Sequence, residues 1–206
     1  SFDTDDWLYR ISTFVQMGGA LIIAAGAGPA INDGDITQVV LGYVVMRLVA
    51  VAQWVRVAVV NPGYRSTATR YAVGITVLQI LWIACLMLIP AGTALWIAIP
   101  LIVLELTVPV VAERARPTPW HPDHLTERFG SFTLIVLGES VLASATAIVL
   151  GRREAAEHGA LYVVAIAGLV TIGAMWWAYF ARGQRDRLVG SLRTAMVFGY
   201  FHFAIF

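Results

Sequence analysis

Apolar residues in this chain form long runs that are separated by short polar segments. Crossing the hydrocarbon core of a bilayer as an α-helix takes about 20 consecutive, mostly apolar residues. Apolar positions in these runs go all round the helix rather than forming one stripe, which is the pattern of membrane helices. The pattern predicts an all-α fold, a polytopic transmembrane helical bundle with about seven spans. They are placed at Trp7–Ala27, Ile36–Val60, Thr69–Ile89, Thr93–Val111, Phe129–Leu150, Ala160–Phe180 and Leu188–Phe206.

The segments between these runs are short, and none is long enough to form a soluble domain. Residues 1–206 are therefore predicted to form a single transmembrane domain. The chain ends inside an apolar run at Ala204-Ile205-Phe206, which predicts an internal excerpt of a longer protein. The connecting segments are Gly28 to Asp35, Asn61 to Gly63, Pro90 to Gly92, and the Pro- and His-rich stretch from Ala112 to Arg128.

The composition narrows the class further. Hydrophobic residues make up 59% of the chain and charged residues 13%, about half the usual share for a soluble domain. A net charge of +1 provides no basic field for nucleic acid. Every basic residue is an arginine, and the absence of lysine excludes a Walker A phosphate loop and a lysine Schiff base. An opsin is therefore excluded, although the helix count resembles one.

The arginines between the runs predict the orientation. Cytoplasmic loops of membrane proteins carry the excess of basic residues. Only Arg152 and Arg153 would lie outside if the N-terminal end is cytoplasmic, and that end is therefore predicted to be cytoplasmic. The cluster of Arg182, Arg185 and Arg187 is predicted to attract anionic lipid head groups, by roughly 1 kcal/mol per charge. The ten arginines on the cytoplasmic side are Arg10, Arg56, Arg65, Arg70, Arg114, Arg116, Arg128, Arg182, Arg185 and Arg187.

Four sequence blocks carry a resemblance to a known family. The segment from His124 to Ser140, HLTERFGSFTLIVLGES, resembles the signature of the bacterial low temperature requirement A (LtrA) family of polytopic membrane proteins. Glu105 lies where that family often has a glutamate within a helix. The other similar blocks are Phe2-Asp3-Thr4-Asp5-Asp6 with Tyr9-Arg10, Trp176-Trp177-Ala178-Tyr179-Phe180, and Tyr200-Phe201-His202.

The chain departs from that family pattern in two respects. Ala181 stands where the family usually has an acid, and the family's first pair of helices and its last helices are missing. The resemblance implies a multi-pass protein of a bacterial cytoplasmic membrane, with the lipid bilayer as its partner. The family name refers to growth in the cold.

Three ionisable residues fall near the middle of predicted spans, namely Arg47, Glu105 and Glu139. Each costs at least roughly 2.5–3.5 kcal/mol at the bilayer centre, so all three are predicted to turn inward and pair. One arginine cannot neutralise two carboxylates, so one glutamate would carry a proton and the cluster would relay protons or bind an ion. The alternative is a structural ion pair that fixes the helix register. Pro109 also removes the N–H partner of the Glu105 carbonyl, which makes that carbonyl an additional ligand for a cation or proton.

Small residues recur four apart on two spans. Ser140 and Ser144 could bond across to another helix, and Ala20, Ala24 and Gly28 could let two helices approach closely. Both patterns predict tight helix packing, and the first predicts that its helix lies inside the bundle.

Several weaker signals have two interpretations each. Glu127 and Arg128 could gate the cytoplasmic end of a helix or lie there solvated. His202 could be a buried, hydrogen-bonded histidine or part of a proton relay. The run His121-Pro122-Asp123-His124 lacks zinc-ligand spacing and is interpreted as a helix start, so no metal and no cofactor are predicted. Arg56 is predicted to extend to the membrane interface.

The leading functional hypothesis is movement of a small solute or ion through a polar core of Glu139, Glu105 and Arg47. The alternative is a non-transporting membrane sensor or scaffold in which the same charges only hold helices together. An enzyme is not expected, because the sequence offers no nucleophile–base pair, metal set or phosphate loop.

Overall fold

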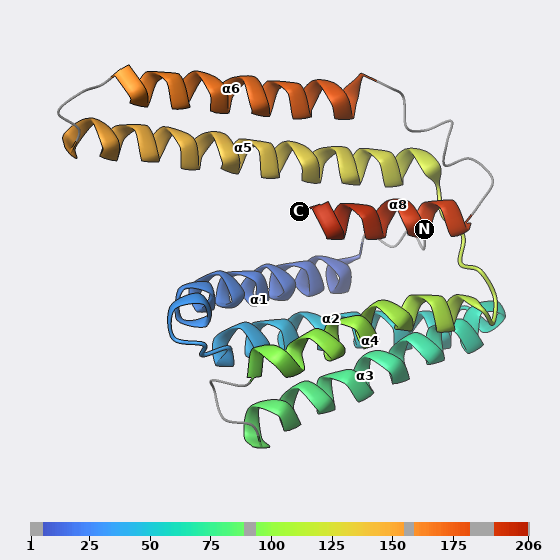
Figure 1. Ribbon diagram of the computed structural model, residues 1–206. Coiled ribbons are helices and arrows are strands. Elements are labelled where there is room, and N and C mark those ends of the chain that lie inside the picture. Colours follow the sequence, from blue (N-terminus) through green and yellow to red (C-terminus); the bar gives the residue numbers. More distant parts are fainter. Residues whose placement is uncertain (1–5, 89–93, 155–158, 182–191, 206) are drawn as a thin grey trace. The chain divides into compact units, whose positions relative to one another are not determined.

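The computed structural model describes residues 6–88, 94–154, 159–181 and 192–205, and within them it contains helices and no strand. The all-α polytopic bundle predicted from the hydropathy pattern is confirmed (Figure 1). The elements are α1 (Trp7–Asn32), α2 (Thr37–Val60), the short 3₁₀ helix η1 (Pro62–Tyr64), α3 (Arg65–Leu88), α4 (Ala94–Glu113), α5 (Pro122–Glu154), α6 (Gly159–Phe180) and α8 (Leu192–Ile205).

Six of these helices are long and apolar enough to cross a membrane. They are α1 to α6, and they correspond to the first six predicted runs. The seventh predicted span, Leu188–Phe206, is represented among the described residues by α8, which has 14 residues and is shorter than a full span.

The described chain divides into two compact units, Ser1–Pro119 and Trp120–Phe206. The first unit contains α1 to α4, and the second contains α5, α6 and α8. The single domain predicted over residues 1–206 stays a prediction.

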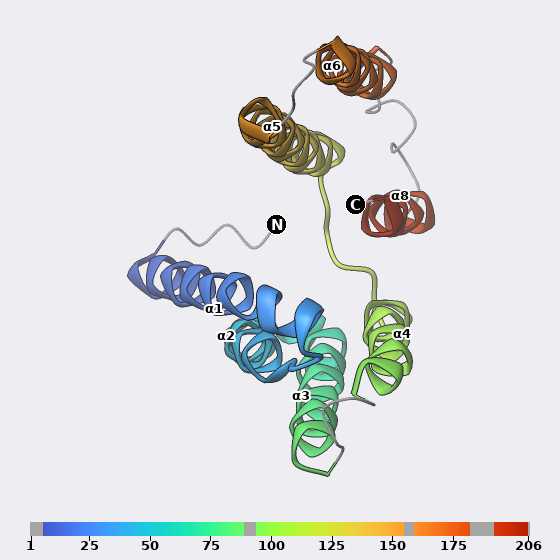
Figure 2. The same cartoon turned by 60° about the vertical axis from the view of Figure 1, so that its left-hand side comes forward.

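In the first unit, each helix packs against the next one along the chain, and the four run side by side (Figures 1 and 2). Tight connections of a few residues between α1 and α2 and between α2 and α3 make these neighbours antiparallel. The buried apolar core of this unit lies where α2, α3 and α4 meet. The residues of that core are Ile36, Val40, Val44, Trp82, Cys85 and Leu101.

Glycine allows α1 and α2 to cross closely. A Cβ placed on Gly19 would lie 2.9 Å from the Gly42 carbonyl oxygen, and one on Gly42 would lie 2.6 Å from the Gly19 carbonyl oxygen. The small-residue spacing instead predicts a packing face of Ala20, Ala24 and Gly28, but these three residues are exposed. A helix turns 100° per residue, so the small residues one position away point to a different side.

Two helix boundaries differ from the prediction by five residues or more. α1 continues through Gly28 and Pro29 to Asn32, because a proline in the last turn removes one backbone bond while its own carbonyl still accepts from the Asp33 N–H at 2.9 Å. α5 begins at Pro122, seven residues before the predicted start at Phe129, with Asp123 in its first turn. Proline is well suited to the first position of a helix. At 33 residues, α5 is about 50 Å long, so its ends extend beyond the hydrocarbon core.

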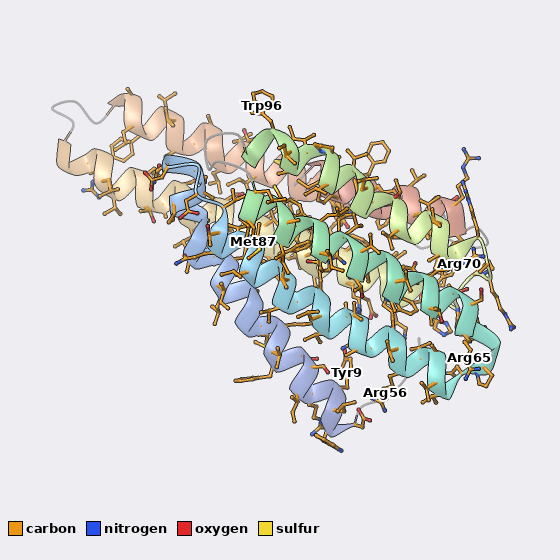
Figure 3. All side chains as sticks on the ribbon, turned by 90° about the horizontal axis from the view of Figure 1, so that it is seen from below. Tyr9, Arg56, Arg65, Arg70, Met87 and Trp96 are labelled. Atoms are coloured by element: carbon orange, nitrogen blue, oxygen red, sulfur yellow. The ribbon has the colours of Figure 1, made fainter. Side chains whose placement is uncertain are left out.

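The two ends of the first unit differ in charge. Figure 3 shows Arg56, Arg65 and Arg70 gathered at one end, with Met87 and Trp96 toward the other. At the arginine end, the Asp6 carboxylate accepts from the Tyr9 N–H at 2.9 Å and so caps α1. The same carboxylate forms a two-pronged ion pair with Arg56, which therefore joins α1 to α2, while the predicted extension of Arg56 to the membrane interface stays a prediction.

In the second unit, α5 and α6 lie side by side and α8 packs against α5 (Figure 1). A Cβ on Gly151 would lie 2.9 Å from the Leu161 side chain, so the far end of α5 approaches α6 closely. The serines of α5 were expected to bond across to another helix. Instead the Ser140 hydroxyl donates to the Val136 carbonyl at 2.9 Å and the Ser144 hydroxyl to the Ser140 carbonyl at 2.7 Å, both within α5.

Candidate functional site

The first unit holds a polar cluster halfway along its helices. Arg47 lies near the middle of α2 and Glu105 near the middle of α4, and their side chains form an ion pair with Nη2 and Oε2 3.2 Å apart. The Glu105 side chain is 6% exposed and the Arg47 side chain 34%. The structure thus brings together two of the three charges singled out at mid-depth.

Neutral polar side chains complete the cluster. From α3, the Gln79 amide Nε2 donates to Glu105 Oε1 at 2.9 Å, so both carboxylate oxygens have a partner. From α2, Arg47 Nε donates to the Tyr43 hydroxyl at 2.7 Å, and the guanidinium lies 4.8 Å from the centre of the Tyr43 ring. Tyr43 in turn contacts Trp82 of α3 edge-on, with ring centres 6.1 Å apart.

Two buried atoms of this cluster have no hydrogen-bond partner among the described residues. They are the acceptor Gln79 Oε1 and the donor Trp82 Nε1. Gln79 is 3% exposed and Trp82 6% exposed. Leaving a polar atom unpaired in an apolar interior is unfavourable, so such atoms mark places where a further molecule can bind.

Three further predicted site residues, Glu139, Glu127 and Arg128, belong to α5 in the second unit. Glu139 is exposed on that helix, and its pairing with Arg47 and Glu105 stays a prediction. Glu127 and Arg128 are both exposed near the start of α5, and Glu127 lies 3.9 Å from His124 Nδ1. The gating role suggested for Glu127 and Arg128 also stays a prediction.

His202 of α8 is buried, with 6% of its surface exposed, and has a partner on both ring nitrogens. Nδ1 lies 2.8 Å from the Phe198 carbonyl oxygen, and Nε2 lies 2.8 Å from the Tyr179 hydroxyl of α6. The Phe129 ring of α5 lies 4.5 Å from the His202 ring, centre to centre. Three helices of the second unit therefore meet at this histidine.

Each residue of the His202 cluster comes from a different sequence block. Phe129 lies in the segment 124–140, Tyr179 in 176–180 and His202 in 200–202. These are three of the four blocks that resembled one family, and the fold of the second unit brings these three into contact although they are far apart in sequence.

Comparison with protein families identifies one matching family. The sequence model of the bacterial low temperature requirement A protein (LtrA) matches residues 1–206, the whole chain. The chain belongs to the LtrA family. Searches of curated proteins and of solved structures found no match to this LtrA protein. Family membership and the six long apolar helices make it an integral, multi-pass membrane protein.

Glu113, at the end of α4, is a buried carboxylate of this LtrA protein that the hydropathy pattern did not single out. Its oxygens accept from the Tyr71 hydroxyl at 3.0 Å, the Thr118 N–H at 2.7 Å and the Thr118 hydroxyl at 2.8 Å. The Tyr71 ring is stacked on Trp54 at 4.0 Å. Glu113 thus fastens the segment after α4 to α3. The signal available in the sequence was a carboxylate at the end of an apolar run, followed by a Pro-containing loop with one hydroxyl residue, Thr118.

The polar cluster lacks the composition of a metal centre. Among the described residues of the LtrA protein, no three His, Cys, Asp or Glu side chains are grouped so that they could hold a metal ion. The arginines predicted to attract anionic lipid, Arg182, Arg185 and Arg187, lie outside the described residues.

Proposed function

We propose that this LtrA protein moves a small solute or ion across the membrane, with Arg47, Gln79 and Glu105 lining part of the path. The proposal rests on two buried atoms without a hydrogen-bond partner, Gln79 Oε1 and Trp82 Nε1. They belong to the same polar cluster as the Arg47–Glu105 ion pair, near the middle of the helices. The membrane interior has no water with which such atoms could bond unless a path admits it. Ionisable groups inside membrane helices also mark substrate and ion pathways.

The proposal extends to Glu139, which would lie on the same path in the full protein. With one arginine and two carboxylates, one glutamate would exchange a proton during the cycle. Substituting Glu139 by glutamine would then preserve the fold and change the pH dependence of flux.

Flux through proteoliposomes containing the full-length protein tests the proposal. A trapped pH-sensitive dye follows protons, and light scattering follows water and small solutes, at several pH values. We expect wild-type flux of at least one probe to exceed that of protein-free liposomes, and Glu105→Gln to reduce it. Asp33→Asn, an acid-to-amide change in the exposed connection between α1 and α2, is the matched control and should leave flux unchanged.

The second candidate is a non-transporting sensor or scaffold, and one observation favours it. The Glu105 carboxylate is already satisfied by Arg47 and Gln79, as expected of an ion pair that fixes helix register. Breaking such a pair destabilises a protein by roughly 3–5 kcal/mol when buried, and by less at Arg47, which is one-third exposed. No flux of any probe, together with a lower melting temperature for Arg47→Met, would support the scaffold and overturn transport.

A further inference from the structure

The two unpartnered atoms in the first unit differ in hydrogen-bonding character. Gln79 Oε1 can only accept a hydrogen bond, and the indole Nε1–H of Trp82 can only donate one. The two residues are three positions apart on α3, so they lie on the same face of that helix. A molecule bound between them must therefore donate to one side and accept from the other.

The charges around these atoms exclude most ions as the occupant. Arg47 and Glu105 are paired at 3.2 Å and cancel each other. A hard cation takes about six or more oxygen ligands, whereas this site has one free side-chain oxygen and a guanidinium close by. An anion would face the Glu105 carboxylate, and Arg47 already directs its donors to Glu105 and Tyr43.

The neighbouring side chains limit the size of the occupant. Trp82 belongs to the buried apolar core of the unit, together with Val44, Cys85 and Leu101. Close-packed cores of this kind leave few voids larger than a water molecule. Buried water is found where at least two polar partners converge, and Gln79 and Trp82 supply an acceptor and a donor.

We infer that Gln79 Oε1 and Trp82 Nε1 together bind one small uncharged molecule, either water or a polar solute of a few heavy atoms. The molecule donates a hydrogen bond to Gln79 and accepts one from Trp82, while the Arg47–Glu105 pair stays intact beside it. As a statement about binding, the inference stands by itself. As a statement that the transported species is uncharged, it rests on the transport proposed above.

Binding is tested on the full-length protein in lipid nanodiscs, with ¹⁵N-labelled tryptophan. The Trp82 indole signal is assigned by its loss in Trp82→Phe, which keeps a smaller aromatic ring in place of the indole and removes the N–H donor. We expect magnetisation transfer from water, or from added urea, to the Trp82 indole hydrogen. An indole signal with the shift of an unbonded N–H and no such transfer would overturn the inference.

Flux identifies the bound species. Water permeability is measured as shrinkage of proteoliposomes in a sucrose gradient, and solute entry with urea and glycerol. Trp82→Phe should lower the permeability to the bound species, water or solute, roughly two- to tenfold, which is the effect of losing one hydrogen bond. Trp96→Phe, an exposed tryptophan in the same unit, is the matched control and should change nothing. Permeability to water alone identifies water as the occupant, and entry of urea or glycerol identifies a solute.

The two proposals can fail separately. Transfer to Trp82 without flux of any probe supports the binding site and overturns transport. Flux of protons or Na⁺ alone, with unchanged rates in Trp82→Phe and no transfer to Trp82, supports transport and overturns the uncharged occupant.

Discussion

Two contacts fix the tautomer of His202. A carbonyl oxygen can only accept, so the 2.8 Å contact with the Phe198 carbonyl places the hydrogen of the neutral ring on Nδ1. Nε2 is then the acceptor for the Tyr179 hydroxyl. The structure therefore supports the buried, hydrogen-bonded interpretation of His202, while the proton relay stays a prediction.

This geometry predicts the effect of Tyr179→Phe. The change leaves Nε2 of a buried histidine without its donor, which should lower the free energy of unfolding by about 1–3 kcal/mol. Thermal unfolding in detergent measures the loss. Tyr162→Phe, on an exposed position of the same helix, should leave the melting temperature unchanged. Equal melting temperatures for Tyr179→Phe and wild type would contradict the hydrogen bond.

At the scale of helices, contact between α1 and α2 depends on which side of α1 faces α2. Gly19 faces Gly42 at backbone distance, whereas a Cβ on Gly18 would meet nothing within 4 Å. Adjacent glycines of one helix thus have opposite roles, because one lies in the contact and the other does not.

Alanine substitutions at Gly18 and Gly19 should change the free energy of unfolding in opposite directions. Gly19→Ala forces the helices apart and should cost about 1–3 kcal/mol, as overpacking does. Gly18→Ala should stabilise the protein by up to about 1 kcal/mol, because alanine is the better helix former. Thermal unfolding of both variants in the same detergent is the measurement. If Gly18→Ala destabilises the protein, or if Gly19→Ala leaves its stability unchanged, the close contact of α1 and α2 at Gly19 is contradicted.

The start of α1 depends on Asp6 both as a helix cap and as a charge. The Arg56 hydrogen bond, followed by the Tyr9 N–H, holds the pKa of Asp6 below the ordinary aspartate value. A lowered pKa means that the stabilisation is fully present above the ordinary pKa and is lost as pH falls through the lowered one.

Two substitutions separate these roles of Asp6. Asp6→Asn keeps an acceptor for the helix N-terminus and loses the charge, so its melting temperature should fall between those of wild type and Asp6→Ala at neutral pH. The difference between wild type and Asp6→Asn should shrink as pH falls below the ordinary aspartate pKa. If the difference in melting temperature between wild type and Asp6→Asn grows as pH falls, the lowered pKa of Asp6 is contradicted.

At the scale of the whole protein, the distribution of arginines predicts the topology. Arg56, Arg65 and Arg70 of the first unit lie at one end of it (Figure 3), and basic residues favour the cytoplasmic side. Asp33 lies in the exposed connection after α1, and Pro117 lies in the exposed segment after α4. Because successive helices alternate in direction, these two positions lie at opposite ends of the first unit.

Labelling of single cysteines tests this orientation. In a Cys85→Ala background, an impermeant maleimide should label Asp33→Cys on intact cells and Pro117→Cys only after the membrane is disrupted. Cys85→Ala replaces one small uncharged residue within α3 by another, so it should not alter the topology. Labelling in the reverse order would place the N-terminal end outside.

The sequence alone determined that this LtrA protein is helical and crosses a membrane, and roughly where each span lies. Hydrophobicity sufficed because lipid requires every spanning segment to be apolar and to satisfy its own backbone. It also identified Arg47 and Glu105, since charges stand out in apolar runs. Helix starts such as Pro122 were misplaced because a helix may continue into polar sequence beyond the membrane.

Only the tertiary structure decided which residues touch. It selected Gly19 over Ala20, added Gln79, Tyr43 and Trp82 to the ion pair, and left two buried atoms of that cluster unpartnered. Neutral polar residues do not stand out in a hydropathy pattern, and their partners depend on how each helix is rotated and shifted against its neighbour. Rotation and register follow from packing over the whole surface of a helix, which no single stretch of sequence contains.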